Sequence, residues 1–226
     1  MTDMYLFTLN SKPTTHIRSF VCRSGRSKIR QRNTQTLYQQ SNAITGLFNF
    51  QHVFKQEQPI VLDIGFGMGD TLLQSAIENI QINYLGIEMH RPGIERILNQ
   101  IEQNKLSNIM IIYGDAVQLC TQHIVAKTLA GVQLFFPDPW PKTRHHKRRL
   151  IQLPFINTLQ RLVQFGGTLQ LVTDWQPYAQ HIRQVFVQSP HWTPLKEQAY
   201  PISKFAKKAQ LTGLMIHNFC FTNSSY

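Results

Sequence analysis

The chain has 226 residues, 42% of them hydrophobic, and its 23 Lys and Arg against 12 Asp and Glu give a net charge of +11. This length and composition suit a single domain with one sizeable core, and no apolar run reaches the roughly 18 residues of a membrane-spanning helix. The positive charge favours a polyanionic partner, with nucleic acid ahead of a membrane surface. The three cysteines lie far apart in sequence, which excludes a CxxC motif and favours a reducing cytoplasm.

Residues 1–35 are polar and basic, and we expect a partly flexible N-terminal arm there, followed by a single domain over 36–226 with a helix within 36–58. From Pro59 onward, apolar runs alternate five times with amphipathic stretches. The runs predict strands at 60–65, 83–88, 109–115, 132–138 and 167–174. The stretches predict helices at 71–80, 93–104, 116–129, 153–165 and 177–189. The alternation predicts an α/β fold with a doubly wound parallel sheet, and residues 192–195 and 213–221 predict a closing hairpin.

Carboxylates stand at the ends of these five strands, although the chain has only 12 acids. The carboxyl ends of parallel strands share one edge of the sheet, where doubly wound folds bind ligands. A single acid in such a place usually caps the next helix, which is the better interpretation for Asp115 or Asp174 alone. Five on one edge instead predict a site for amines, hydroxyls or positive charge: Asp63, Glu88, Asp115, Asp138 and Asp174.

The segment "DIGFGMGD" (63–70) is a turn whose glycines stand at alternate positions: Gly65, Gly67 and Gly69. A nicotinamide fingerprint, GxGxxG, would need glycine at position 70, where Asp70 would instead oppose a pyrophosphate. The pattern GxGxG fits a cofactor without phosphate, such as S-adenosylmethionine. In that interpretation Glu88 accepts from the ribose hydroxyls, Asp115 from the adenine amine, and Asp63 from the ammonium of the methionine part.

The segment "FFPDPW" (135–140) places Asp138 between an apolar strand and a basic run. Guanine N7 has an in-plane lone pair and no proton, so methyl transfer to it needs alignment rather than a general base. Asp138 could accept from guanine N1–H and the amino group, which leaves N7 bare and favours the positive charge growing on the ring. Trp140 could stack on a base or pack into the core. The two-residue spacing of acid and aromatic differs from (D/N)PP(Y/F/W), which argues against an exocyclic amine as target.

The basic run "KTRHHKRR" (142–149) follows at once, and its position beside the proposed base site favours phosphate contacts over a merely solvated surface. Its two histidines fit that surface better than a metal site, and we expect no metal. The residues proposed to contact nucleic acid are Lys142, Arg144, His145, His146, Lys147, Arg148 and Arg149.

Several segments resemble the bacterial tRNA (guanine-N(7)-)-methyltransferases: "IRSFVCRSGR", "LDIGFGMGD", "YLGIEMHRPG", "GDAVQL", "QLFFPDPWPKTRHHKRRLIQ", "TDWQPYA" and "SKFAKKAQLTG". The resemblance implies a class I S-adenosylmethionine-dependent methyltransferase fold, with a mostly parallel seven-stranded sheet whose last strand is antiparallel. It implies methylation of a guanine in the tRNA variable loop, with Asp138 as the catalytic residue. It also implies that Asp63, Glu88, Asp115 and Asp138 contact the cofactor, that Lys142 and Asp174 bind the RNA substrate, and that residues 144–149 touch tRNA.

One loop departs from that family. Relatives read Thr-Lys-Phe-Glu where this chain has Ser203, Lys204, Phe205 and Ala206, and Ala206 lacks a carboxylate that helps to bind ligand in relatives. This change motivates an alternative, a non-catalytic RNA-binding protein on a methyltransferase scaffold. An NAD-dependent oxidoreductase is a weaker alternative because of Asp70. We expect an active cytoplasmic enzyme that needs tRNA but no membrane, metal or protein partner.

Overall fold

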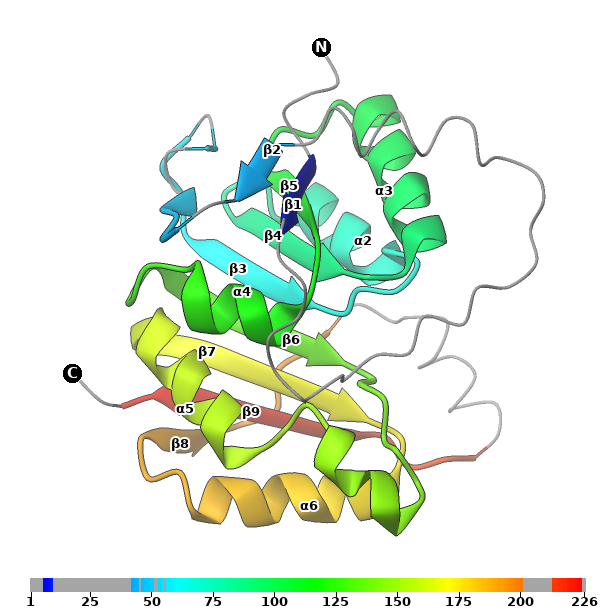
Figure 1. Cartoon of the computed structure of the whole chain (residues 1–226), viewed down its shortest axis with the longest axis vertical. Coiled ribbons are helices and arrows are strands. Elements are labelled where there is room, and N and C mark those ends of the chain that lie inside the picture. The colour runs from blue at the N-terminus through cyan, green and yellow to red at the C-terminus, as the bar shows by residue number, and fades with distance from the viewer. Residues whose placement is uncertain are drawn as a thin grey trace.

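The computed structural model describes residues 6–9, 42–44, 46–50, 53–54, 56–200 and 213–224. These residues form a nine-stranded sheet in the order β2-β1-β5-β4-β3-β6-β7-β9-β8 (Figure 1). Neighbours from β2 to β7 in this order are parallel, whereas β9 is antiparallel to both β7 and β8. The strands are β1 Leu6–Leu9, β2 Asn42–Ile44, β3 Ile60–Ile64, β4 Asn83–Glu88, β5 Ile109–Tyr113, β6 Leu129–Phe135, β7 Val163–Thr173, β8 Trp192–Leu195 and β9 His217–Asn223.

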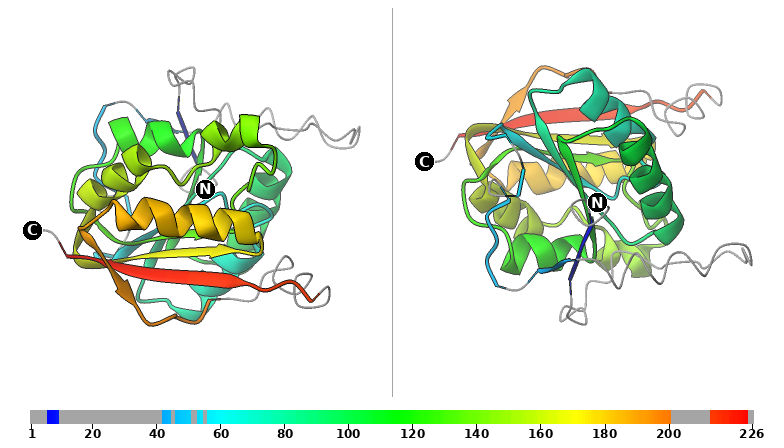
Figure 2. Two further views of the ribbon diagram at one scale, coloured as in Figure 1. Left: turned by 90° about the horizontal axis from the view of Figure 1, so that it is seen from below. Right: turned by 90° about the horizontal axis from the view of Figure 1, so that it is seen from above.

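Helices cover both faces of the sheet (Figure 2). They are α2 Asp70–Glu78, α3 Arg91–Gln103, α4 Ala116–Gln122, α5 Leu153–Leu162 and α6 Gln176–Val187. Helices α2 and α3 share one core with β5, which contains Ile97 and Ile111. Helices α4, α5 and α6 share the other core, which contains Leu119 and Ile182. Alternate residues of a strand face opposite sides, so Ile111 joins the first core and Ile112 the second.

Strands β3 to β9 are the seven predicted strands, and their mostly parallel arrangement with an antiparallel C-terminal strand confirms the predicted fold class. Strands β1 and β2 extend the sheet beyond β5 and were not predicted. Strand β1 lies within the expected arm, and its Leu6 and Phe7 are buried beside Ile111 and Ile112. This short segment therefore belongs to the sheet, and the rest of the arm lies outside the described residues.

Helix α4 is shorter than its sequence pattern predicts. It ends at Gln122, because the backbone N–H of Phe48 donates to His123 O at 2.7 Å and Phe48 pairs with Ile124 in a β-bridge. The described residues of 36–58 form β2, the bridge at Phe48 and turns, and the helix expected within 36–58 is not tested, because residues 36–41, 45, 51–52 and 55 lie outside the described residues. A contact between distant segments has therefore decided where α4 ends.

Helix α5 also ends early, at Leu162, because Val163 already pairs with Leu129 of β6 at the start of β7. The basic run contains an unpredicted 3-10 helix, η2 Thr143–Arg148. In the part of the chain that the structure describes, no helix is long and apolar enough to cross a membrane. The same part contains no group of three His, Cys, Asp or Glu side chains that could hold a metal ion.

Candidate active site

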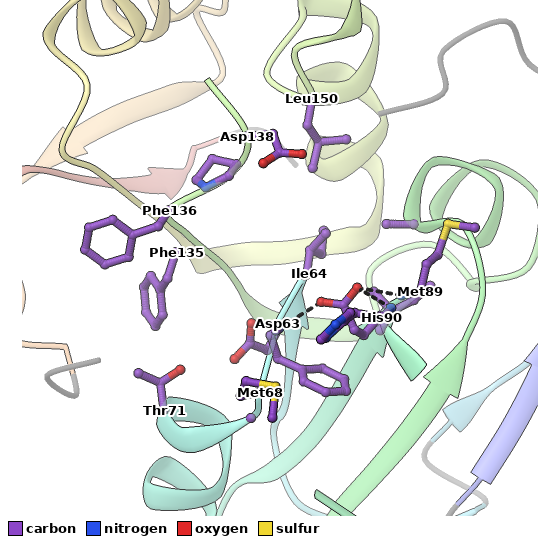
Figure 3. A pocket seen from close by; sticks show the side chains of 18 of the residues that line it. Asp63, Ile64, Met68, Thr71, Met89, His90, Phe135, Phe136, Asp138 and Leu150 are labelled. Carbon is purple, nitrogen blue, oxygen red and sulfur yellow. Dashed lines mark hydrogen bonds between the residues drawn. The ribbon is translucent and has the colours of Figure 1, made fainter. Parts of the chain in front are cut away.

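A cavity of about 420 Å³ opens at the carboxyl ends of β3, β4, β5 and β6 (Figure 3). Its wall combines the turn after β3, the ends of β4 and β5, and the loop after β6. Four of the five predicted strand-end acids line it: Asp63, Glu88, Asp115 and Asp138. The fifth, Asp174, follows β7 at the same edge but is not part of the wall.

The glycine-rich turn forms the floor of the cavity and depends on a backbone that other residues rarely adopt. Gly65, Gly67 and Gly69 have φ angles of 74°, 60° and 79° in the left-handed region. Helix α3 presses against this turn, since a Cβ added at Gly93 would overlap the carbonyl oxygen of Gly67. The turn is therefore fixed by its own conformation and by the helix behind it.

Glu88, at the end of β4, is 6% exposed and held by three backbone N–H groups. Its Oε2 accepts from Gly67 N at 2.8 Å, and its Oε1 accepts from Met89 N at 2.6 Å and His90 N at 2.9 Å. A carboxylate has about four acceptor positions, so one remains for a ligand donor. For Glu88 to accept from two ribose hydroxyls, as predicted, both hydroxyls would have to use this one position, or one of the three backbone N–H groups would have to give up its bond to Glu88.

Asp63 is 1% exposed, and its Oδ2 has no hydrogen-bond partner. Burial, and then the nearby charge of Glu88, raises the pKa of Asp63 to about 7. A buried acceptor without a partner is costly, and native proteins leave few of them. On a cavity wall, this oxygen is open to a ligand that brings a donor or a positive charge.

Asp115 and Asp70 have structural partners as well as positions on the cavity wall. The Oδ1 of Asp115 accepts from Gln118 N at 2.9 Å and caps α4, as its helix-capping interpretation predicts. Asp70 lies in the first turn of α2 and pairs with Arg96 at 2.5 Å. Its charge stands at the helix end that binds the pyrophosphate in dinucleotide folds, which opposes a nicotinamide cofactor.

The loop "FFPDPW" carries Asp138 on the opposite side of the cavity from Asp63 (Figure 3). Asp138 is exposed, whereas Asp63 is buried. Phe136 and Trp140 on either side of it have φ angles of 53° and 45°, a conformation that is strained for bulky residues. Such strain persists only where the surroundings enforce it and is typical of functional sites.

The basic run presents its cations unevenly. Lys142, Arg144 and Lys147 are exposed, and His145, His146 and Arg148 are partly buried. The guanidinium of Arg148 lies 5.0 Å from the centre of the Trp140 ring, and the ring of His145 packs against the same indole at 5.5 Å. These contacts favour packing over base stacking for Trp140. Burial, with the charges of Arg148 and Arg144, lowers the pKa of His145, so this ring adds little charge at neutral pH.

Arg149 differs from the sequence prediction, because it is only 2% exposed and its side chain points inward. It cannot meet a phosphate from this position. Asp174 is half-buried, and its expected helix-capping alternative is not seen, since Trp175 holds the N-cap position of α6 without a side-chain bond. The predicted loop of Ser203, Lys204, Phe205 and Ala206 lies outside the described residues.

Sequence reasoning missed the backbone donors that hold Glu88 and the interior position of Arg149. No residue type announces a backbone donor, so Met89 and His90 gave no signal. The sequence does contain a signal for the buried position of Arg149, because this residue directly precedes Leu150 and Ile151, where the chain enters the core. The end of a basic run beside apolar residues indicates a cation that returns to the interior.

The sheet order and the glycine turn at its carboxyl edge define a class I methyltransferase fold. The 16S rRNA methyltransferase KamB shares this fold with a TM-score of 0.58 and 10% identity, covering 80% of this chain and 96% of that protein. The aminoglycoside resistance methyltransferase NpmB1 aligns with a TM-score of 0.51 and 17% identity, over 73% of this chain and 87% of its own.

Sequence comparison gives a narrower assignment. Residues 57–218 match the family described as "Putative methyltransferase". The tRNA (guanine-N(7)-)-methyltransferase of Pectobacterium atrosepticum is 34% identical over 226 residues, covering 95% of each chain. The protein of the same name from Yersinia pestis is 37% identical with the same coverage. The chain belongs to the tRNA (guanine-N(7)-)-methyltransferase family.

Proposed function

We propose that this protein transfers a methyl group from S-adenosylmethionine to N7 of a guanine in tRNA. The main supporting observation is one cavity whose wall contains four strand-end carboxylates and Asp70, with exposures that range from buried Asp63 to exposed Asp138. A cavity of about 420 Å³ suits a small cofactor and is too small for an oligonucleotide. The RNA must therefore approach at the exposed end, beside Asp138.

The residues of the cavity fit S-adenosylmethionine. The unpartnered Oδ2 of Asp63 suits its ammonium, the remaining acceptor position of Glu88 suits a ribose hydroxyl, and Asp115 lies on the wall where it can accept from the adenine amine. The bound cofactor supplies an electrophilic methyl group on a positively charged sulfur. The absence of a phosphate suits a turn that ends in Asp70.

Asp138 orients the guanine. Its carboxylate accepts from guanine N1–H and the amino group, which holds the base while N7 faces the methyl group. Because N7 carries no proton, alignment supplies most of the acceleration and no general base is required. The negative charge of Asp138 also favours the cation that forms on the methylated ring.

The exposed cations of the basic run hold the RNA backbone. Lys142, Arg144 and Lys147 follow Asp138 closely in the chain and can neutralise phosphates around the bound guanine. We assign the target to the variable loop of tRNA, with Lys142 and Asp174 close to the substrate, and we place the enzyme in the cytoplasm. Residues 203–206 and the part of the N-terminal arm beyond β1, which lie outside the described residues, would add further contacts.

A second candidate is an RNA-binding protein without catalytic activity, which is favoured by Ala206 in place of a ligand-binding carboxylate. Such a protein would bind tRNA and incorporate no methyl group. The buried acids of the cavity, Asp63, Glu88 and Asp115, favour the enzyme, because a protein that only binds RNA has no use for buried acids at a cavity wall.

The decisive experiment incubates unmodified tRNA with the protein and methyl-labelled cofactor, then digests the tRNA to nucleosides for mass spectrometry. The expected product is 7-methylguanosine, at one position of the variable loop. The Asp138→Asn variant is the matched control, since it keeps the side-chain shape and should lose transfer while keeping tRNA binding. Binding of tRNA and cofactor with no methylated nucleoside would instead establish the second candidate.

A further inference from the structure

Arg149 ends the basic run, yet its side chain lies in the interior beneath the Asp138 loop. It is 2% exposed, whereas Lys142, Arg144 and Lys147 of the same run are exposed. Its Nε donates to the carbonyl oxygen of Pro139 at 2.9 Å, and its buried Nη2 has no hydrogen-bond partner. Among the described residues, no carboxylate forms an ion pair with it.

The carbonyl that Arg149 holds belongs to the residue directly after Asp138. The loop around it is strained at Phe136 and Trp140, so it needs external bonds to keep its shape. The N–H of Phe136 donates to Val172 O at 2.7 Å and fixes the loop before Asp138. The bond from Arg149 fixes it after Asp138.

The side chain of Arg149 packs on the ring of Tyr178. Its guanidinium lies 5.1 Å from the centre of the Tyr178 ring, and Tyr178 is fully buried. The Tyr178 hydroxyl accepts from Ile151 N at 3.2 Å, so the ring is bonded to the backbone two residues after Arg149. Burial lowers the pKa of Arg149 and raises the pKa of Tyr178. Near pH 7 the guanidinium of Arg149 is nevertheless charged and the hydroxyl of Tyr178 is neutral.

We propose that Arg149 is a positioning residue for methyl transfer: it fixes the Pro139 carbonyl and thereby the direction in which Asp138 meets the guanine, and it does not bind tRNA phosphate. This inference rests on the proposed function of Asp138. A buried cation without a carboxylate is a poor device for stability, since apolar residues of similar size serve as well or better. The bond that its Nε donates to the carbonyl oxygen of Pro139 explains why Arg149 is buried there.

The test compares Arg149→Met, which keeps length and burial but removes the donor, with the wild-type full chain. We expect kcat for tRNA methylation to fall about 100-fold, the cost of a small misplacement of a reacting group. The KM for tRNA, its salt dependence and cofactor affinity should stay within about twofold, because Arg149 touches neither ligand. The melting temperature should be unchanged or higher.

Arg161→Met is the control for loss of an arginine bond to a backbone carbonyl, because Arg161, although exposed, donates to Cys120 O at 3.0 Å and lies outside the cavity wall. It should leave kcat unchanged. A higher KM and a shallower salt slope in Arg149→Met, with kcat retained, would overturn the proposal in favour of phosphate binding. An equal loss of kcat in both variants would make the role of Arg149 merely structural.

A second measurement covers the case in which Arg149→Met does not fold. In the wild-type full chain labelled with heavy nitrogen at arginine, Arg149 Nε–H should exchange slowly with water, both free and with tRNA bound. Fast exchange in the complex would show that the side chain leaves the interior, and would refute the proposal. Failure of the proposed function is distinguishable, since the wild-type protein would then form no 7-methylguanosine.

Discussion

The raised pKa of Asp63 predicts that cofactor binding depends on pH. Only the ionised carboxylate attracts an ammonium, and the pKa of Asp63 in the free protein is about 7. About a tenth of the molecules are then ionised near pH 6 and about three quarters near pH 7.5. The affinity for S-adenosylmethionine should therefore rise about eightfold over this interval.

Isothermal titration calorimetry measures this effect directly. Binding near pH 6.5 ionises Asp63, so the released proton should make the apparent enthalpy depend on the ionisation enthalpy of the buffer. The cofactor's own amino group titrates near pH 8, so the comparison is kept below that value. Asp63→Asn is the control, because it preserves shape and cannot titrate. An equal pH slope in both proteins would refute the assignment of Asp63 to the ammonium.

The same shift has a consequence for the stability of the free protein. A carboxyl whose folded-state pKa rises from 3.8 to about 7 keeps its proton longer in the folded than in the unfolded chain. The folded state therefore loses stability as the pH rises from about 4 to about 7, by up to roughly 4 kcal/mol. Urea unfolding of the cofactor-free protein at several pH values measures the slope, which Asp63→Asn should flatten.

Three further substitutions probe the turn, the α4 cap and the basic run. Gly93→Ala should destabilise the protein by about 1–3 kcal/mol, because its Cβ would overlap the carbonyl oxygen of Gly67, and should weaken cofactor binding in calorimetry. Asp115→Ala should cost about 1 kcal/mol in urea unfolding because it removes the α4 cap, whereas Asp115→Asn should retain stability and change only cofactor affinity. Replacing Arg144 and Lys147 by Ala should reduce the salt dependence of tRNA binding by about one unit of slope for each phosphate that is no longer neutralised, and an unchanged slope would mean that neither contacts phosphate.

The central strands and their carboxylates were predictable because burial on both faces leaves a local signature. Runs such as "IVLDIG" and "IMIIYGD" are mostly apolar and carry their acid at or near the end, so the end of the strand and the site residue are predicted together. The parallel topology then brings Asp63, Glu88 and Asp115 to one edge without any further information.

The errors share a different cause, which is contact between segments distant in sequence. Helix α4 stops where His123 and Ile124 meet Phe48, and β7 begins early where Val163 meets Leu129. Strand β1 is short, and its strand conformation depends on pairing with β5 on one side and β2 on the other. Local periodicity contains none of these partners, so no local rule could find them.

The distribution of charge follows the path of charge in the reaction. In the proposed reaction, methyl transfer removes the positive charge from the sulfur of the cofactor and creates one on the guanine, beside Asp138, while the ammonium beside Asp63 keeps its charge. Acids therefore line the cavity where positive charge is held or formed, and the exposed cations of the basic run lie outside it, where we propose that they meet phosphates. A buried cation close to the path would oppose this movement unless its role were geometric. Arg149 is such a cation, and its bond to Pro139 rather than to a phosphate or a carboxylate is the arrangement that this reasoning requires.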